Sequence, residues 1–266
     1  MTGAEEEGGD GLHSIIADLE AEQRALVELL EGLPEDAWDR PSPAEGWTLR
    51  DCVSHLAETD ERAAEAVLAV PIPAGGTRRE GVLTEGQLRA RSLPPKAVLA
   101  WYRQAAAHLG EALRRLRPED RPSWAGRPMG ARSFISARIM EHWSHGLDIH
   151  DAAGIPPVDT DRLRHVAHLG VITRDFAFRN RGLTPPSEPF YVELTAPSGA
   201  TWTWGPADAR QRIAGPAGDF CRVVTQRIHP SDTRLVAVGE DALRFLEVAQ
   251  AFAGPPGSGR APRKRE

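Results

Sequence analysis

The chain has 266 residues, of which 41% are hydrophobic and 26% charged, and its formal net charge is −6. This length suffices for one large or two modest domains, and the composition is that of a soluble globular protein. The acidic balance argues against a nucleic-acid-binding protein, and no apolar run approaches the ~20 residues that span a bilayer. We expect a cytoplasmic location, because the acidic, Gly-rich N-terminus does not resemble a secretory signal.

The first half of the chain predicts helices. We expect residues 1–10 to be disordered and an apolar stripe to form a helix over 12–32. Thr48 and Asp51 are spaced as a capping box, which predicts a second helix from Thr48 to about residue 70. Residues 71–94 are rich in Pro and Gly and predict a long connection with room for a short helix.

Three further helices follow in the sequence pattern. Apolar residues at helical spacing predict one over 95–117 and another over 131–153. A fifth helix is expected to begin after residues 159–161 and to run to about Arg181. Long amphipathic helices with variable connections are typical of a helical bundle.

The character of the chain changes near residues 182–186. Alternating apolar residues predict strands over 190–195 and 201–204, joined by the turn at Pro197-Ser198-Gly199. Further segments predict a helix over 217–227, a strand over 235–238 and a helix over 241–252. We therefore expect an α+β protein with a helical domain over 11–183, a small α+β domain over 187–253, and a disordered tail over 254–266.

One segment of the fourth helix carries unusual chemistry. In Arg138–His150, Glu141 and His145 lie one helical turn apart, and Asp148 falls on the same arc. The opposite side of this segment is apolar, which indicates a buried helix. Burying an acid and an imidazole is costly unless they are paired, and metal coordination is one arrangement that makes it tolerable.

His55 is the best candidate for a third ligand from another helix. It lies beside the apolar arc of the second helix, so it is expected to point inward. A His₂Glu set with one open position is typical of catalytic zinc, although a carboxylate ligand also suits nickel, iron or manganese. The segment reads E-H-x-x-H from Glu141 to His145, so the zincin protease motif is absent.

Other interpretations of these residues stay open at this point. A core histidine is often satisfied by a backbone carbonyl, and His142 with His145 forms a rival pair. The two cysteines, Cys52 and Cys221, are not in a CxxC pair, and Cys52 is interpreted as a small packing residue inside a helix. His150 lies opposite Glu141 on the helix and is not expected to be a ligand.

The segment Glu45-Gly46-Trp47-Thr48-Leu49-Arg50-Asp51-Cys52-Val53-Ser54-His55-Leu56 resembles the GWT-x-R-D-x-x-x-H-L segment of the DinB-like superfamily. More narrowly, the chain resembles the mycothiol-dependent maleylpyruvate isomerase branch of actinobacteria, within a subfamily described as metal-binding. Glu141-x-x-x-His145-Gly146-x-Asp148 resembles the second metal segment of that branch. Residues from Tyr191 to Gly254 resemble its small sterol-carrier-like domain.

The resemblance implies specific roles. His55, Glu141 and His145 would be the metal ligands in a bundle with a four-helix core, followed by an α+β domain. The metal, zinc before nickel, iron or manganese, would activate a low-molecular-weight thiol, usually mycothiol, for S-transfer or isomerisation of a small substrate. Arg227 matches a family arginine that would bind a substrate carboxylate. Independently of the resemblance, Asp148 at i+3 from His145 is placed either to orient an imidazole of the site or to pair with an arginine.

Three functions follow as hypotheses. The first is a metal-dependent, mycothiol-type transferase or isomerase, as a monomer or homodimer that binds a small substrate and a thiol but no nucleic acid or membrane. The second is a non-catalytic metal- or ligand-binding protein, which coordination by His142 would favour because it closes the site. The third is a metal-dependent hydrolase, which needs a general base such as Asp148 or Glu58.

Overall fold

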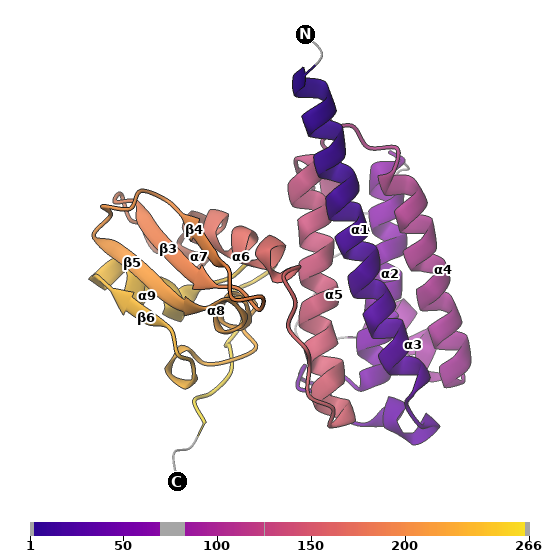
Figure 1. The fold of residues 1–266 in the computed structure, drawn as a ribbon. Coiled ribbons are helices and arrows are strands. Elements are labelled where there is room, and N and C mark those ends of the chain that lie inside the picture. The colour runs from indigo at the N-terminus through magenta and orange to yellow at the C-terminus, as the bar shows by residue number, and fades with distance from the viewer. Residues whose placement is uncertain (1–2, 70–82, 125, 264–266) are drawn as a thin grey trace. The chain divides into compact units, whose positions relative to one another are not determined.

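The computed structural model describes residues 3–69, 83–124 and 126–263, and gives only the backbone for residues 3–10. The chain divides into two compact units, Met1–Pro157 and Val158–Glu266 (Figure 1). The helical first unit and the sheet of the second unit confirm the α+β class. The division falls after Pro157, earlier than the boundary expected near residue 183. Among the described residues, no helix is both long and apolar enough to span a membrane.

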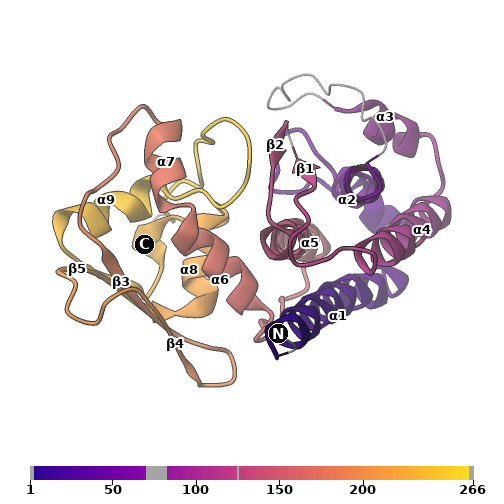
Figure 2. The same ribbon diagram turned by 90° about the horizontal axis from the view of Figure 1, so that it is seen from above.

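Four long helices form the bundle of the first unit. Seen along the bundle in Figure 2, each helix lies beside two others around a shared interior. The helices are α1 (Gly3–Glu31), α2 (Leu49–Val67), α4 (Pro95–Leu113) and α5 (Ala131–Ala153). Shorter elements connect them: η1 (Glu35–Asp39), α3 (Glu85–Arg91), β1 (Ser123–Trp124) and β2 (Arg127–Pro128).

The bounds predicted from the sequence agree best with the structure for α5, which spans 131–153 as expected. By contrast, α2 and α4 end earlier than expected, at Val67 and Leu113. The first helix begins at Gly3 instead of residue 12, so residues 3–10, which were expected to be disordered, are helical, and residues 1–2 lie outside the described residues. The Ala and Glu residues of this stretch favour helices, and acids near a helix N-terminus complement its dipole. The small β1–β2 hairpin was not predicted.

The start of α2 is fixed by the predicted capping box. The Thr48 hydroxyl accepts from the Asp51 amide, and the Asp51 carboxylate accepts from the Thr48 amide at 2.8 Å. Gly46 supplies the left-handed turn (φ 74°) that brings the chain into this cap. The buried Asp51 carboxylate also forms an ion pair with Arg91 of α3 at 2.7 Å. These contacts hold α3 against the beginning of α2.

Polar side chains from all four helices meet inside the otherwise apolar bundle. Gln23 of α1, Asp60 of α2, Tyr102 of α4 and His142 of α5 are each at most 5% exposed. The His142 ring contacts all three of the others at 3.0–3.2 Å. Arg138, one turn before His142, is 2% exposed and pairs with Asp60 at 3.1 Å. We call these five residues the buried polar layer.

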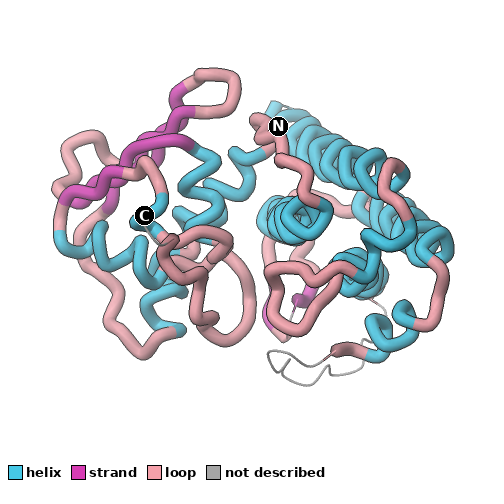
Figure 3. The backbone as a smooth tube through the Cα atoms, turned by 90° about the horizontal axis from the view of Figure 1, so that it is seen from below, coloured by secondary structure: helices cyan, strands magenta, loops and turns pink. Residues whose placement is uncertain are grey.

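The second unit is a four-stranded sheet with helices on one face (Figure 3). The strand order is β4-β3-β5-β6, with β3 parallel to β5 and the other pairs antiparallel. The strands are β3 (Phe190–Thr195), β4 (Thr201–Trp204), β5 (Gln211–Pro216) and β6 (Val236–Val238). The helices of this unit are α6 (Leu163–Ile172), α7 (Arg174–Asn180), α8 (Ala217–Val224), η2 (Pro230–Asp232) and α9 (Glu240–Val248).

The alternation predicted for β3 is confirmed. Phe190, Val192 and Leu194 are buried, and Glu193 and Thr195 are exposed. By contrast, the sequence analysis did not predict β5, although it is the parallel partner of β3. Its residues, Gln-Arg-Ile-Ala-Gly-Pro, include Gly and Pro and show no alternation of apolar side chains.

The expected fifth helix is two helices, and both belong to the second unit. A break at Thr173 separates α6 from α7, and the Thr173 hydroxyl donates to the carbonyl of Leu169 at 2.8 Å. α6 packs closely on α8: a Cβ added at Gly170 would lie 2.9 Å from side-chain atoms of Phe220 and Val224. This packing explains why the unit begins at Val158, before the Pro-rich segment that the sequence analysis took as the boundary.

Candidate metal centre

The three residues predicted as metal ligands come together inside the first unit. His55 of α2 faces Glu141 of α5, and its Nε2 lies 3.4 Å from Glu141 Oε2. His145, one turn further along α5, places its Nε2 3.7 Å from the same oxygen. One ligand atom from each residue lies within 4.8 Å of the others. Three donors on two helices therefore converge on one point.

This arrangement fits a divalent metal. In a tetrahedral zinc site with bonds of about 2.0–2.1 Å, neighbouring ligand atoms lie roughly 3.3–3.4 Å apart. The two separations from Glu141 Oε2 are close to that value. Two imidazoles and one carboxylate also leave coordination positions for water or substrate, as in catalytic sites.

Glu141 carries a negative charge at this point. Burial alone would raise the pKa of its carboxyl, but the hydrogen bond from His55 and the charges of His145, His55 and Arg138 lower this pKa far below its ordinary value. Its side chain is 24% exposed, compared with 5% for His55 and 12% for His145. A carboxylate whose charged form is favoured in this way, beside two imidazoles, is suited to a cation.

Trp47 packs against both imidazoles. Its ring stacks on His145 with centroids 5.5 Å apart and planes at 21°, and it lies 5.2 Å from the centroid of His55. The His55 and His145 rings meet edge to face at 4.7 Å. The indole is 8% exposed, so it shields one side of the rings from water. This contact was not predicted from the sequence, where Trp47 was noted only as part of the family segment.

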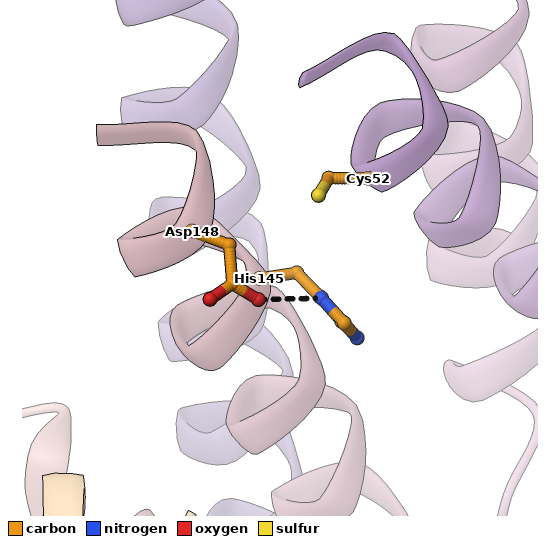
Figure 4. Close-up of side chains that lie close together, drawn as sticks. All are labelled: Cys52, His145 and Asp148. Carbon is orange, nitrogen blue, oxygen red and sulfur yellow. Dashed lines mark hydrogen bonds and ion pairs between the residues drawn. The ribbon is translucent and has the colours of Figure 1, made fainter. Parts of the chain in front are cut away.

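Asp148 lies next to the site, on the far side of the His145 ring. Its Oδ2 is 3.1 Å from His145 Nδ1, as the dashed line in Figure 4 shows. A carboxylate at this nitrogen favours the tautomer that leaves Nε2 available as a metal ligand. The orienting role predicted for Asp148 thus has the required geometry and stays a prediction.

The other sequence candidates lie in different surroundings. His142 belongs to the buried polar layer, where Asp60, Gln23 and Tyr102 use its ring nitrogens. The His150 Nδ1 contacts the carbonyl oxygen of Ile155 at 3.0 Å. Arg227 lies in the second unit and donates to the carbonyl oxygen of Thr225 at 2.7 Å. Its predicted role towards a substrate carboxylate stays a prediction.

Cys52 lies closer to the site than its sequence position suggested. It is fully buried, as predicted for a packing residue, but a ligand atom from each of Cys52, His145 and Asp148 lies within 4.8 Å of the others. Cys52 is three residues before His55, which puts both on one side of α2. That spacing was the available signal for this proximity.

Known proteins share this fold and these segments. The family model described as the mycothiol maleylpyruvate isomerase N-terminal domain matches residues 19–150, which contain all three candidate ligands. The chain belongs to this family, within the DinB-like superfamily. A second model, described as wyosine base formation, matches residues 186–238 in the second unit.

Relatives and solved structures agree with that assignment. Uncharacterised proteins from two strains of Mycobacterium tuberculosis are 46% identical over 250 residues, covering 92% of this chain and 97% of theirs. The crystal structure of the mycothiol-dependent maleylpyruvate isomerase matches with a TM-score of 0.57 at 18% identity. A histidine-to-alanine mutant of that isomerase matches with a TM-score of 0.59 at 17% identity. Each of the two matches covers 85% of this chain and 92% of the solved chain. At these identities the likeness shows the fold.

Proposed function

We propose that this protein is a divalent-metal-dependent enzyme that uses a low-molecular-weight thiol of the mycothiol type. The reaction is S-transfer to a small substrate or thiol-assisted isomerisation of one, and a carboxylated substrate is the natural class for the isomerisation. The observation that carries the proposal is the convergence of His55 Nε2, Glu141 Oε2 and His145 Nε2 on one point between α2 and α5. The family of the chain supports the thiol chemistry.

Each residue of the centre has a part in this proposal. His55, Glu141 and His145 hold the metal, Asp148 fixes the ring of His145, and Trp47 excludes water from one side. A bound divalent metal lowers the pKa of a coordinated thiol, so that the thiolate is available near neutral pH. In an isomerisation, the thiolate adds to a conjugated double bond to give an enolate, the resulting single bond rotates, and elimination restores the double bond and releases the thiolate.

The contacts around the centre bear on the two alternative functions. A closed metal site in a binding protein would use His142 as a further ligand, but its ring is engaged by Asp60, Gln23 and Tyr102. A metal-dependent hydrolase would need Glu58 or Asp148 as a general base. Glu58 accepts a hydrogen bond from Thr84 at 2.6 Å, and Asp148 contacts His145. We therefore prefer the thiol reaction.

Metal analysis of purified protein tests the proposed ligands. We expect the wild-type chain to retain stoichiometric divalent metal after dialysis, with zinc the first choice. His55→Ala and His145→Ala should lose this metal, because two remaining ligands bind a cation far more weakly. His150→Ala is the matched control, since His150 lies on the same helix as His145 but contacts a backbone carbonyl.

The thiol reaction needs its own test. The metal-loaded enzyme should accelerate thiol-dependent conversion of cis-configured conjugated dicarboxylates or of electrophilic S-acceptors, and His55→Ala should reduce that rate to background. Metal bound stoichiometrically without any thiol-dependent turnover would favour a binding protein. Turnover of an ester or amide substrate without thiol would favour the hydrolase.

A further inference from the structure

The His145 ring has two nitrogens, and each faces a different set of ligands. Nε2 faces Glu141 and His55, whereas Nδ1 lies 3.1 Å from Asp148 Oδ2. On this second side, Figure 4 shows the Cys52 sulfur projecting from α2 towards the Asp148 carboxylate and the His145 ring on α5. The ligand atoms of Cys52, His145 and Asp148 lie within 4.8 Å of one another.

The chemistry of this second set differs from that of the first. It combines a thiol, an imidazole and a carboxylate, and a thiolate is the soft ligand that selects zinc and similar ions. The surroundings are dry: Cys52 is 0% exposed, and the Asp148 side chain is 1% exposed. The Cys52 thiol donates a weak hydrogen bond to the Ser42 hydroxyl at 3.5 Å. The cluster therefore holds three donors of different chemistry.

We propose that Cys52, His145 and Asp148 form a second site, which takes a thiophilic divalent metal ion and shares the His145 ring with the first. On binding, the Cys52 sulfur and the Nδ1 of His145 become ligands and each releases its proton to solvent, so coordination replaces the hydrogen bond between Nδ1 and Asp148. Asp148 orients the His145 ring through that hydrogen bond only while this second site is empty. The ring then bridges two cations, one at each nitrogen. This site does not depend on the thiol reaction proposed above, although it shares one ligand with the metal centre.

Cobalt is a suitable probe because a cobalt–thiolate bond absorbs in the near ultraviolet, whereas nitrogen and oxygen ligands give only visible bands. We expect titration of the metal-free full-length protein with Co²⁺ to give visible bands first and the near-ultraviolet thiolate band at higher occupancy. Cys52→Ser should lose the thiolate band and keep the visible bands. His55→Ala should keep the thiolate band, because His55 belongs only to the first site.

Cys221→Ser is the matched control, since Cys221 is also buried but lies in the second unit beside the carbonyl of Leu163. It should keep the thiolate band, and His145→Ala should abolish both sets of bands. Circular dichroism of each variant identifies any that fails to fold, and Cys52→Ala then provides a second replacement that also lacks the thiolate.

The results separate this inference from the proposed function. Visible bands with no thiolate band in the wild-type protein would overturn the second site and leave the metal centre standing. A thiolate band lost in both Cys52→Ser and His55→Ala would mean one mixed site, which also overturns the proposal. A thiolate band without the first set of bands would support the second site and contradict the proposed centre. Absence of every band would contradict both.

Discussion

His142 and His145 show how three residues of helix separate two environments. His145 faces Glu141 and Asp148 at the candidate centre, and its side chain is 12% exposed. His142 faces the interior of the bundle, where Asp60 lies 3.0 Å from its Nε2 and both side chains are fully buried. From sequence spacing, His142 paired with His145 was an alternative to Glu141 paired with His145 as the set of ligands. The structure places the two rings in different surroundings, so they are not alternatives for one position.

Asp60 is the residue on which the buried polar layer depends, because it contacts Gln23, Arg138 and His142. Burial alone would raise the pKa of Asp60, but His142 and Arg138 together hold it below its ordinary value of 3.8. Asp60→Asn leaves the buried Arg138 without its carboxylate, so we expect it to lower the free energy of unfolding by about 3–5 kcal/mol. Urea unfolding at neutral pH measures this difference.

The lowered pKa of Asp60 also determines how the stability difference between wild type and Asp60→Asn depends on pH. Folding favours the charged carboxylate of Asp60, so this group stabilises the folded state fully at pH values well above 3.8, its ordinary pKa. That stabilisation is lost as the pH falls through the lower pKa of the folded state. The gap between wild type and Asp60→Asn should therefore be constant above about pH 5 and shrink in more acidic solution. Asp120→Asn, which removes a half-buried partner of the exposed Arg117, is the control and should change stability little. A gap independent of pH down to unfolding would contradict the assignment.

At the scale of elements, sequence pattern was most informative where a helix or strand obeys local rules. The helix over 131–153 and the strands over 190–195 and 201–204 have the predicted bounds, because their periodicity is strong. The Thr48–Asp51 capping box was predicted because it, too, is a local pattern that the sequence displays directly. The strand over 211–216 was missed because its order comes from pairing with β3, and this long-range contact leaves no local pattern.

The candidate site shows the same contrast between what local sequence patterns predict and what depends on long-range contacts. His55, Glu141 and His145 were predicted from inward-facing positions and from the family segments, and the structure brings their ligand atoms together. The proximity of Cys52 and Trp47 to the His145 ring depends on the register of α2 against α5. A single sequence does not specify that register, so Cys52 was interpreted as a packing residue and the contact of Trp47 was not predicted.

The capping box makes a testable contribution to α2. We expect Thr48→Ala to lower the free energy of unfolding by about 1 kcal/mol, because the Asp51 amide loses its side-chain acceptor. Thr48→Ser keeps a hydroxyl at this position and should stay close to wild type. Denaturant titration of the three proteins measures the effect. Equal stability of all three would show that the cap adds nothing beyond the packing of the helix.

At the scale of the whole molecule, the candidate ligands all lie in the first unit. A ligand that binds only the folded state stabilises it, by about 2.7 kcal/mol when its concentration is 100 times its dissociation constant. We expect saturating zinc to slow hydrogen exchange of the most protected amides in α2 and α5 by up to about 100-fold relative to chelator-treated protein. Mass spectrometry of peptides from the full chain measures this.

Peptides from the sheet of the second unit provide the internal comparison in that experiment. Strands β3 to β6 contain no residue of either candidate metal set, so zinc should leave their exchange unchanged. His55→Ala should remove the zinc effect from α2 and α5. Protection that appears only in the sheet would place the cation elsewhere and contradict the candidate centre.

The position of the boundary between the units also affects how the protein is made. Every candidate ligand, from Cys52 to Asp148, precedes Pro157, and the sheet begins only at Phe190. A ribosome releases the N-terminal part first, and domains generally fold as units during synthesis. All the ligands therefore leave the ribosome before the sheet does. If the bundle binds the proposed cation, it can acquire it while the second unit is still being translated.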